Sequence, residues 1–283
     1  ALNRLDFLAV SDLFMTPTAA LADIVLPAAT SFEFDDIGHY GLGHGYVLAR
    51  PKVVDPPENC RPDIQILNDL GSAMTSTEHW FSDYHELVEI VVKPSGLTFK
   101  AFSERGYLKG EDRFKKYEAG GFKTPMKKVE LCLSTAEKFK LHALPEALDP
   151  PRDDPDYPLV LTSCKDRFYL HSSYRWVKTL RDKSAEPMVE IHPETAAVLG
   201  IQEGDAVRIE TRAGQISQKA RLTPHIHPRV VSAAYGWWFP EQDIVDKGNW
   251  TRANFNMLTT TDGLGREFGT PNLKGIGCRI SLA

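Results

Sequence analysis

The first fifty residues carry two short apolar runs separated by a short helical stretch. Residues 5–10 (LDFLAV) and 24–26 (IVL) have the composition of buried strands, and Pro27 ends the second run. Between them, residues 16–17 (Thr-Pro) suit the N-cap and first turn of a helix over residues 18–22. Two apolar strands joined by a helix predict the edge of a parallel sheet.

Helical spacing then becomes the main pattern. In residues 62–74 the apolar side chains of Ile64, Leu67 and Leu70 share one face, and a proline occupies the first turn. A glycine-rich loop at residues 38–45 comes before this helix, but it is not a dinucleotide fingerprint because no helix follows it. The pattern predicts four further elements: a strand over residues 46–49, helices over residues 84–92 and 98–105, and a strand over residues 129–133.

A segment rich in proline and aspartate divides the chain. Residues 145–158 hold five prolines among four aspartates, and such a segment continues neither a helix nor a central strand. We place the domain boundary there, with residues 1–150 as the first domain and residues 151–283 as the second.

Short strands with regular turns fill the second domain. Residues 192–200 between them predict a short helix that ends at Gly200, and Ala213-Gly214 predicts a hairpin. Many short strands separated by turns are typical of a small closed β-barrel. The candidate strands are residues 159–162, 188–191, 206–210, 215–220 and 230–233.

The amino-acid composition and net charge argue against several classes of function. The chain has 283 residues, 42% of them hydrophobic and 25% charged, which is the balance of a globular protein. A net charge of -5 argues against a protein that binds a nucleic-acid backbone. No apolar run approaches the length of a membrane span, and the first residues do not resemble a signal peptide. The sequence does not indicate the cellular compartment. We expect the chain to begin in the middle of a longer protein.

Cysteine and histidine spacing predicts no metal site in this chain. Its four cysteines form no C-x-x-C pair, which excludes the usual zinc and iron–sulfur spacings. His225 and His227 are bracketed by prolines without a nearby third ligand, so an exposed turn is expected. Glu33, His39 and His44 are candidates for proton transfer, although a solvated loop is the simpler interpretation.

Five segments, in order, resemble the molybdopterin oxidoreductases of the dimethyl sulfoxide reductase family. The resemblance spans nearly the whole chain. The segments are residues 16–27 (TPTAALADIVLP), 121–131 (GFKTPMKKVEL), 191–207 (IHPETAAVLGIQEGDAV), 235–238 (YGWW) and 254–259 (NFNMLT).

The resemblance implies a fold and a cofactor. It implies an α/β remnant, made of a parallel sheet edge and helices, followed by an all-β six-stranded double-psi β-barrel. Members of the family bind two molybdopterin guanine dinucleotides that clasp one Mo or W. The N-terminal region that carries the metal ligand, and often a [4Fe–4S] motif, is not in this sequence. We therefore expect the C-terminal part of a larger enzyme, inert by itself, whose intact form has an iron–sulfur electron-transfer subunit as a possible partner.

The resemblance also implies the residues that contact the cofactor. A pterin dinucleotide offers a pyrophosphate and two heterocycles, which call for backbone N–H groups, hydroxyls, cations and amides. Without the resemblance, the same residues would be interpreted as turn, cap or core residues. The predicted contacts are Thr162, Ser163, Cys164, Lys165, Arg167, His171, Ser172, Tyr174, Trp237, Asn254, Asn256 and Lys274.

Three departures and several rival functions stay open. Lys165-Asp166 stands where many relatives have Gly-Arg or Arg-Glu, Met126-Lys127 replaces a usual Ser-Gly, and Arg229 replaces a common glycine. They leave the subfamily open. The substrate depends mainly on the missing N-terminal region, and the catalytic residues are unknown. The leading hypothesis is an oxidoreductase that moves oxygen atoms, hydride or electrons. The alternatives are a hydratase of the same family that uses a metal-activated water, a stand-alone double-psi barrel binding module, and a self-processing barrel enzyme.

Overall fold

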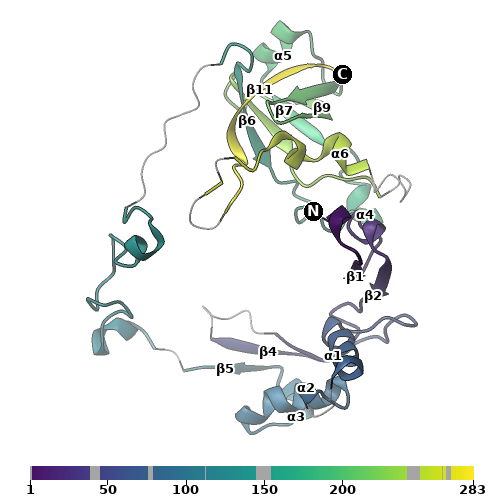
Figure 1. Ribbon diagram of the computed structural model, residues 1–283, viewed down its shortest axis with the longest axis vertical. Helices are drawn as coiled ribbons and strands as arrows, with labels where there is room; N and C mark the ends of the chain where they lie inside the picture. The colour runs from purple at the N-terminus through teal and green to yellow at the C-terminus, as the bar shows by residue number, and fades with distance from the viewer. Residues whose placement is uncertain are drawn as a thin grey trace. The chain divides into compact units, whose positions relative to one another are not determined.

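The computed structural model forms two compact units, Ala1–Lys128 and Val129–Ala283 (Figure 1). It describes residues 2–38, 45–75, 79–111, 113–144, 154–240, 249–262, 264–265 and 269–283. The boundary expected after residue 150 falls among residues outside this description and stays a prediction. In the described residues, none of the helices has both the length and the apolar character needed to cross a bilayer.

The first unit begins with the expected parallel strand pair. β1 (Ala9–Asp12) runs parallel to β2 (Ile24–Pro27), and the single turn η2 (Ala19–Leu21) connects them. The Thr16 hydroxyl accepts a hydrogen bond from the Ala19 amide at 3.2 Å, which starts that turn as its position predicts. The extent of the first strand was predicted wrongly. Residues 5–8 are not extended in the sheet, and the side chains of Leu5 and Phe7 are 54% and 59% exposed.

The rest of the first unit is a small antiparallel sheet with helices. Its strands are β3 (Asp36–Gly38), β4 (Tyr46–Arg50) and β5 (Tyr107–Lys109), in that order. α2 and α3 contribute Val88, Val92, Phe99 and Phe102 to its core. The predicted helices are confirmed to within one residue as α1 (Asp63–Met74), α2 (Tyr84–Val92) and α3 (Phe99–Arg105).

Further 3-10 turns lie in the first unit and in the segment that leads to the barrel. η1 (Leu2–Arg4) and η4 (Lys93–Ser95) belong to the first unit, and η5 (Lys116–Ala119) and η6 (Ala136–Phe139) lie along the connection. The strand predicted at residues 129–133 is wrong: the segment bends, and Leu131 is 82% exposed. An alternating pattern needs a neighbouring strand to become a sheet, and in the described residues none pairs with this segment.

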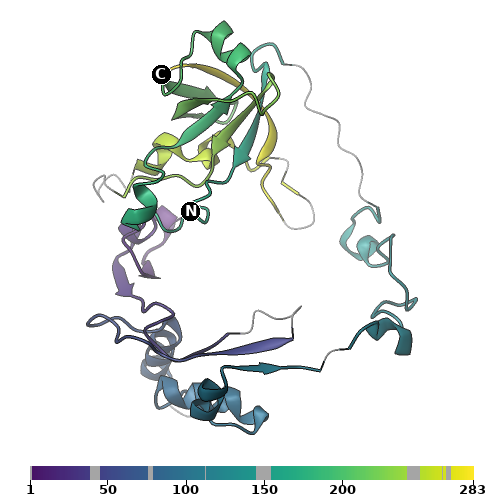
Figure 2. The same ribbon diagram turned by 180° about the vertical axis from the view of Figure 1, so that it is seen from behind.

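The second unit, which we call the barrel unit, contains a closed six-stranded barrel (Figures 1 and 2). The strand order is β10-β6-β11-β8-β9-β7; β6–β10 and β7–β9 are parallel pairs, and the others are antiparallel. Such mixed closure confirms the predicted barrel. The strands are β6 (Leu159–Cys164), β7 (Met188–Ile191), β8 (Ala206–Glu210), β9 (Gln215–Leu222), β10 (Val230–Ala234) and β11 (Lys274–Leu282).

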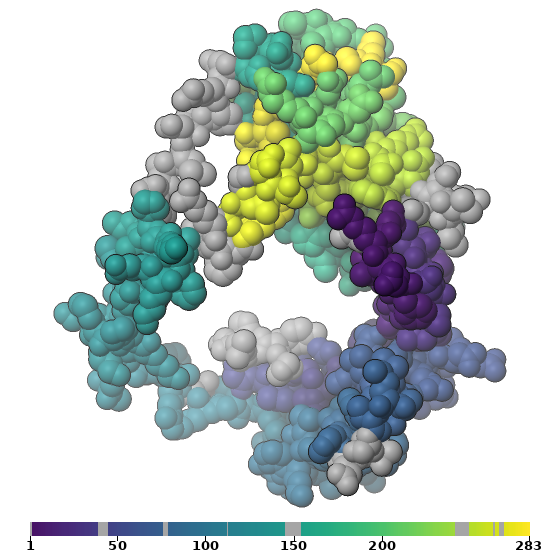
Figure 3. Space-filling view, in the orientation of Figure 1, coloured from purple at the N-terminus to yellow at the C-terminus, as the bar shows by residue number. Residues whose placement is uncertain are grey.

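Alternation along the strands builds the barrel core. Val207 and Ile209 on β8, and Ile216 and Ala220 on β9, are almost fully buried, whereas their strand neighbours face outward. The helix α5 (Pro193–Leu199) ends at Gly200, whose φ of 69° is the left-handed stop expected there. The short helices α4 (Lys178–Arg181), α6 (Trp250–Ala253) and η8 (Phe255–Leu258) complete the unit, and the last two contact β9. In the space-filling view, the yellow-green part of the chain that holds them packs against the green part of the barrel unit (Figure 3).

Candidate functional site

Three strand ends meet at one end of the barrel. Because β6 and β10 are parallel, their carboxyl ends coincide, with Thr162 opposite Ser232 and Cys164 opposite Ala234. The antiparallel strand β11 begins on the other side of β6, where Lys274 lies opposite Thr162. We call this place, made of residues 162–164, 232–234 and 273–274, the β6 end of the barrel.

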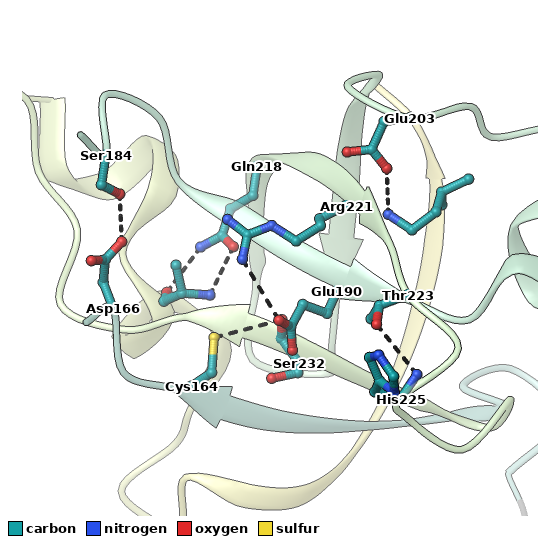
Figure 4. Close-up of polar contacts among 12 residues, drawn as sticks. Cys164, Asp166, Ser184, Glu190, Glu203, Gln218, Arg221, Thr223, His225 and Ser232 are labelled. Carbon is teal, nitrogen blue, oxygen red and sulfur yellow. Dashed lines mark hydrogen bonds and ion pairs between the residues drawn. The ribbon is translucent and has the colours of Figure 1, made fainter. Parts of the chain in front are cut away.

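The β6 end carries hydroxyls, a thiol and cations. The Ser163 amide donates to the Leu273 carbonyl at 3.1 Å, and the Cys164 thiol donates to the Ser232 carbonyl at 3.8 Å. Burial raises the pKa of the Cys164 thiol, so the group stays neutral near pH 7. Beyond the strand, Lys165 and Arg167 are exposed. Asp166 between them accepts a hydrogen bond from the Ser184 hydroxyl (Figure 4).

A turn at residues 171–174 follows, and it docks on the segment after β10. Two of its residues, His171 and Tyr174, have left-handed φ angles of 55° and 68°. Trp238 Nε1 donates to the Ser172 carbonyl at 2.8 Å. Gly236 lies so close that a Cβ there would come within 2.8 Å of the His171 carbonyl carbon. The 171–174 turn and the segment after β10, which are far apart in the sequence, thus form one surface.

Tyr235 connects this turn to the strand ends. Its amide donates to the Cys164 carbonyl at 3.0 Å, while its ring lies 5.5 Å from the His171 ring and 6.3 Å from that of Phe255. The exposed side chains of His171, Ser172 and Tyr174 therefore belong to the same end of the barrel as Thr162 and Ser163.

The two predicted asparagines lie on a cap rather than on an extended stretch. The Asn254 side chain donates to the Trp237 carbonyl at 3.2 Å and accepts from the Asn256 amide at 3.0 Å, so it caps η8. The two side chains do not alternate along one extended segment, because the 3-10 turn η8 begins between them. Asn256 is exposed and presents its amide to solvent.

Trp237 is fully buried, with 0% of its surface exposed. Its ring packs at right angles to that of Tyr169, with 5.6 Å between the centroids. In this structure Trp237 supports the neighbouring segments and presents no surface to a ligand.

Two buried polar residues that the sequence analysis does not single out hold these segments together. Arg175 is 1% exposed, and its Nη2 lies 3.3 Å from the carbonyl oxygens of both His171 and Gly236. Gln218, also 1% exposed, donates to the carbonyls of Ala234 at 3.0 Å and Ala253 at 3.1 Å. Its Oε1 accepts from the Ala234 amide at 3.0 Å (Figure 4).

The remaining candidate residues lie elsewhere. His225 and His227 are exposed in the turn after β9, and no metal-binding group of three or more side chains occurs in the described part of the chain. The Glu33 carboxylate accepts a hydrogen bond from the Thr30 amide at 2.7 Å. His39 and His44 lie outside the described residues.

Family models match both units. The molybdopterin oxidoreductase model matches residues 1–73, and the molydopterin dinucleotide binding domain model matches residues 159–277, which includes the β6 end and the 171–174 turn. The chain belongs to the molybdopterin oxidoreductases. Within this family, the second match covers the barrel from its first strand into β11.

Its relatives in the family have diverse names. The chain is 29% identical to acetylene hydratase of Syntrophotalea acetylenica over 95% of its length, and 31% identical to an F420-dependent formate dehydrogenase subunit alpha of Methanococcus maripaludis over 82%. These alignments cover 39% and 34% of the two relatives. The structure of acetylene hydratase from Pelobacter acetylenicus superposes with a TM-score of 0.91 at 27% identity, covering 100% of this chain and 41% of the other. The chain thus spans between about a third and two fifths of the length of these relatives.

Proposed function

We propose that this chain is the cofactor-holding C-terminal part of a molybdenum or tungsten enzyme, and that the β6 end binds molybdopterin guanine dinucleotide. The main support for the proposal is that predicted contact residues from separate segments lie together. Residues from β6, the 171–174 turn, η8 and the start of β11 meet at one end of a barrel matched by the dinucleotide-binding model. The whole enzyme would move oxygen atoms, hydride or electrons, and the metal centre would supply that chemistry when bound.

The donor set at this end fits a pterin dinucleotide. Thr162 and Ser163 offer hydroxyls at a strand end, where they could donate hydrogen bonds to a pyrophosphate. The exposed cations of Lys165, Arg167 and Lys274 would balance the phosphate charge. The residues proposed to line the site further on are Cys164, His171, Ser172, Tyr174 and Asn256, with Asn254 and Trp237 fixing their backbone.

The exposed apolar faces of the first unit support a longer protein. Ile64, Leu67, Leu70 and Met74 form a stripe on α1, and each is at least 47% exposed. Among the described residues the parallel sheet β1–β2 has two strands, whereas parallel sheets are normally covered on both faces. We propose that further domains of the same enzyme cover these faces and carry the metal ligand. A [4Fe–4S] cluster there, and an iron–sulfur partner subunit, belong to the same proposal.

A hydratase is the second candidate. Acetylene hydratase matches this chain about as well as the formate dehydrogenase does, so overall similarity does not separate the two reactions. Hydration needs no electron acceptor, whereas oxidation of a substrate does. Turnover of the native enzyme with and without a dye acceptor would therefore distinguish them. A stand-alone barrel module is disfavoured, because residues 1–73 match the oxidoreductase model as well.

The decisive experiment is mass, metal and nucleotide analysis of the native protein from its source. We expect a polypeptide well above 31.7 kDa that contains Mo or W and releases guanine nucleotide on denaturation. A native protein of 31.7 kDa without metal or nucleotide would overturn the proposal.

A paired variant tests the site itself. Thr162→Ala removes a hydroxyl at the β6 end, and we expect it to lower the guanine nucleotide released per polypeptide. Thr223→Ala removes a hydroxyl beyond β9, where Leu222 pairs with Ile191 at the opposite end of the barrel (Figure 4). Occupancy in this control should match the parent protein. Equal occupancy in both variants would remove Thr162 from the site.

A further inference from the structure

A buried cation lies directly beneath the 171–174 turn. The guanidinium carbon of Arg175 lies 3.9 Å from the ring centroid of Tyr169 and 3.9 Å from that of Trp237, so it sits in the corner formed by two perpendicular aromatic rings. Burial lowers the pKa of Arg175 to about 10, which still leaves it charged at neutral pH.

The contacts of Arg175 join two segments that are far apart in sequence. Its Nη2 reaches the carbonyl of His171 in the turn and the carbonyl of Gly236 after β10. The turn needs such a contact, because two of its non-glycine residues have left-handed backbone angles that are locally unfavourable. By holding the backbone of the turn, Arg175 fixes the positions of the exposed side chains of His171, Ser172 and Tyr174.

A purely structural role would favour a different residue. Arg175 Nε and Nη1 make no hydrogen bond to any described residue, although both atoms are buried. Unsatisfied buried donors are costly, and an apolar side chain of similar length would avoid that cost. The buried charge therefore indicates a role other than filling the core.

We propose that Arg175 is a positioning residue for the cofactor: it fixes the 171–174 turn against Gly236 and so sets where His171, Ser172 and Tyr174 meet the pterin dinucleotide. This inference rests on the proposed function of the β6 end. Arg175 itself is too deeply buried to touch the cofactor, and it acts through the turn.

The test compares Arg175→Met and Arg175→Lys with Arg221→Met in the native, full-length protein. Arg221 is exposed on β9 beside Glu190, so its replacement removes the same charge from the barrel surface (Figure 4). Three readouts are used: amide hydrogen exchange at residues 171–175, guanine nucleotide released per polypeptide on denaturation, and the melting midpoint of the barrel unit.

We expect Arg175→Met to raise the exchange rates in the turn and to lower nucleotide occupancy by about tenfold, with an unchanged melting midpoint of the barrel unit. Arg175→Lys keeps a donor for both carbonyls but loses the planar guanidinium that contacts the two rings, so it should rescue part of both losses. Arg221→Met should leave all three readouts at parent values.

Two results would overturn the inference. In one, the turn keeps parent exchange rates and occupancy in Arg175→Met. In the other, the barrel unit of Arg175→Met unfolds and Arg175→Lys rescues nothing, which would make Arg175 a core residue only. A parent protein that carries no nucleotide would instead refute the proposed function, and the exchange data would still show whether Arg175 fixes the turn.

Discussion

Replacing Gln218 with leucine should destabilise the barrel by breaking three hydrogen bonds at once. The amide joins the backbone of Ala234, at the end of β10, to that of Ala253 in α6, and it lies in the barrel interior. A buried hydrogen bond contributes about 1 kcal/mol net, so the loss of three predicts about 3 kcal/mol. For a domain of this size, that corresponds to a fall in melting midpoint of about 6–12 °C.

Urea unfolding followed by tryptophan fluorescence provides the assay. Of the five tryptophans, only Trp80 lies in the first unit, so the signal reports mainly on the barrel unit. Gln215→Leu is the matched control, because Gln215 is exposed at the start of the same strand. A Gln218→Leu free energy of unfolding within about 1 kcal/mol of the control would refute the reasoning.

Gln218→Glu gives a second, pH-dependent arm. A carboxyl buried at this position has its pKa raised in the folded state above the unfolded value of about 4.3. The protonated acid is therefore favoured by folding, and the variant loses stability as pH rises through that value and above it. A Gln218→Glu protein equally stable at pH 4 and pH 8 would show that water reaches the side chain.

Two further predictions concern close packing and buried thiols. Gly236→Ala combines a φ of 69° with a contact of 2.8 Å to the His171 backbone, so it should cost at least twice as much as Gly204→Ala, which has a φ of 83° and no atom within 4 Å; equal urea midpoints would contradict this. Burial raises the pKa of Cys278 to about 12 from 9.0. The stability that this thiol contributes is complete below pH 9 and falls by about 1.4 kcal/mol by pH 10, relative to Cys278→Ala. Ellman's reagent should label the exposed Cys132 at once and Cys278 only on unfolding, and rapid labelling of both in the folded protein would disprove the burial.

Periodicity in the sequence predicted the elements that bury one regular face. The helices α1, α2 and α3 and five barrel strands lie where their apolar spacing placed them. β11 was not among the candidate strands, because Gly275 and Gly277 interrupt its pattern and its barrel partners are far away in sequence. The segment at residues 129–133 shows the reverse case, in which a strand-like pattern has no partner.

The site prediction missed residues whose role depends on tertiary contacts. The resemblance supplied the segments at the β6 end, but not the residues that hold them together. Gln218 left a signal: it is a polar residue at an inward position between Ile216 and Ala220. Arg175 left none, because its two aromatic neighbours, Tyr169 and Trp237, meet it only after the chain has folded.

Pairing between strands that are far apart in the sequence has a consequence for biosynthesis of the barrel. Each edge of β6 is completed by residues made much later, Val230–Ala234 on one side and the strand from Lys274 onward on the other. Contacts between such distant residues form slowly, since the entropy of closing a long loop must be met first. A nascent chain that stops short of β11 therefore leaves β6 and β8 as open edges with the core exposed. The β6 end cannot take its final shape until translation has passed that strand, so any ligand bound there must be loaded after synthesis of the barrel.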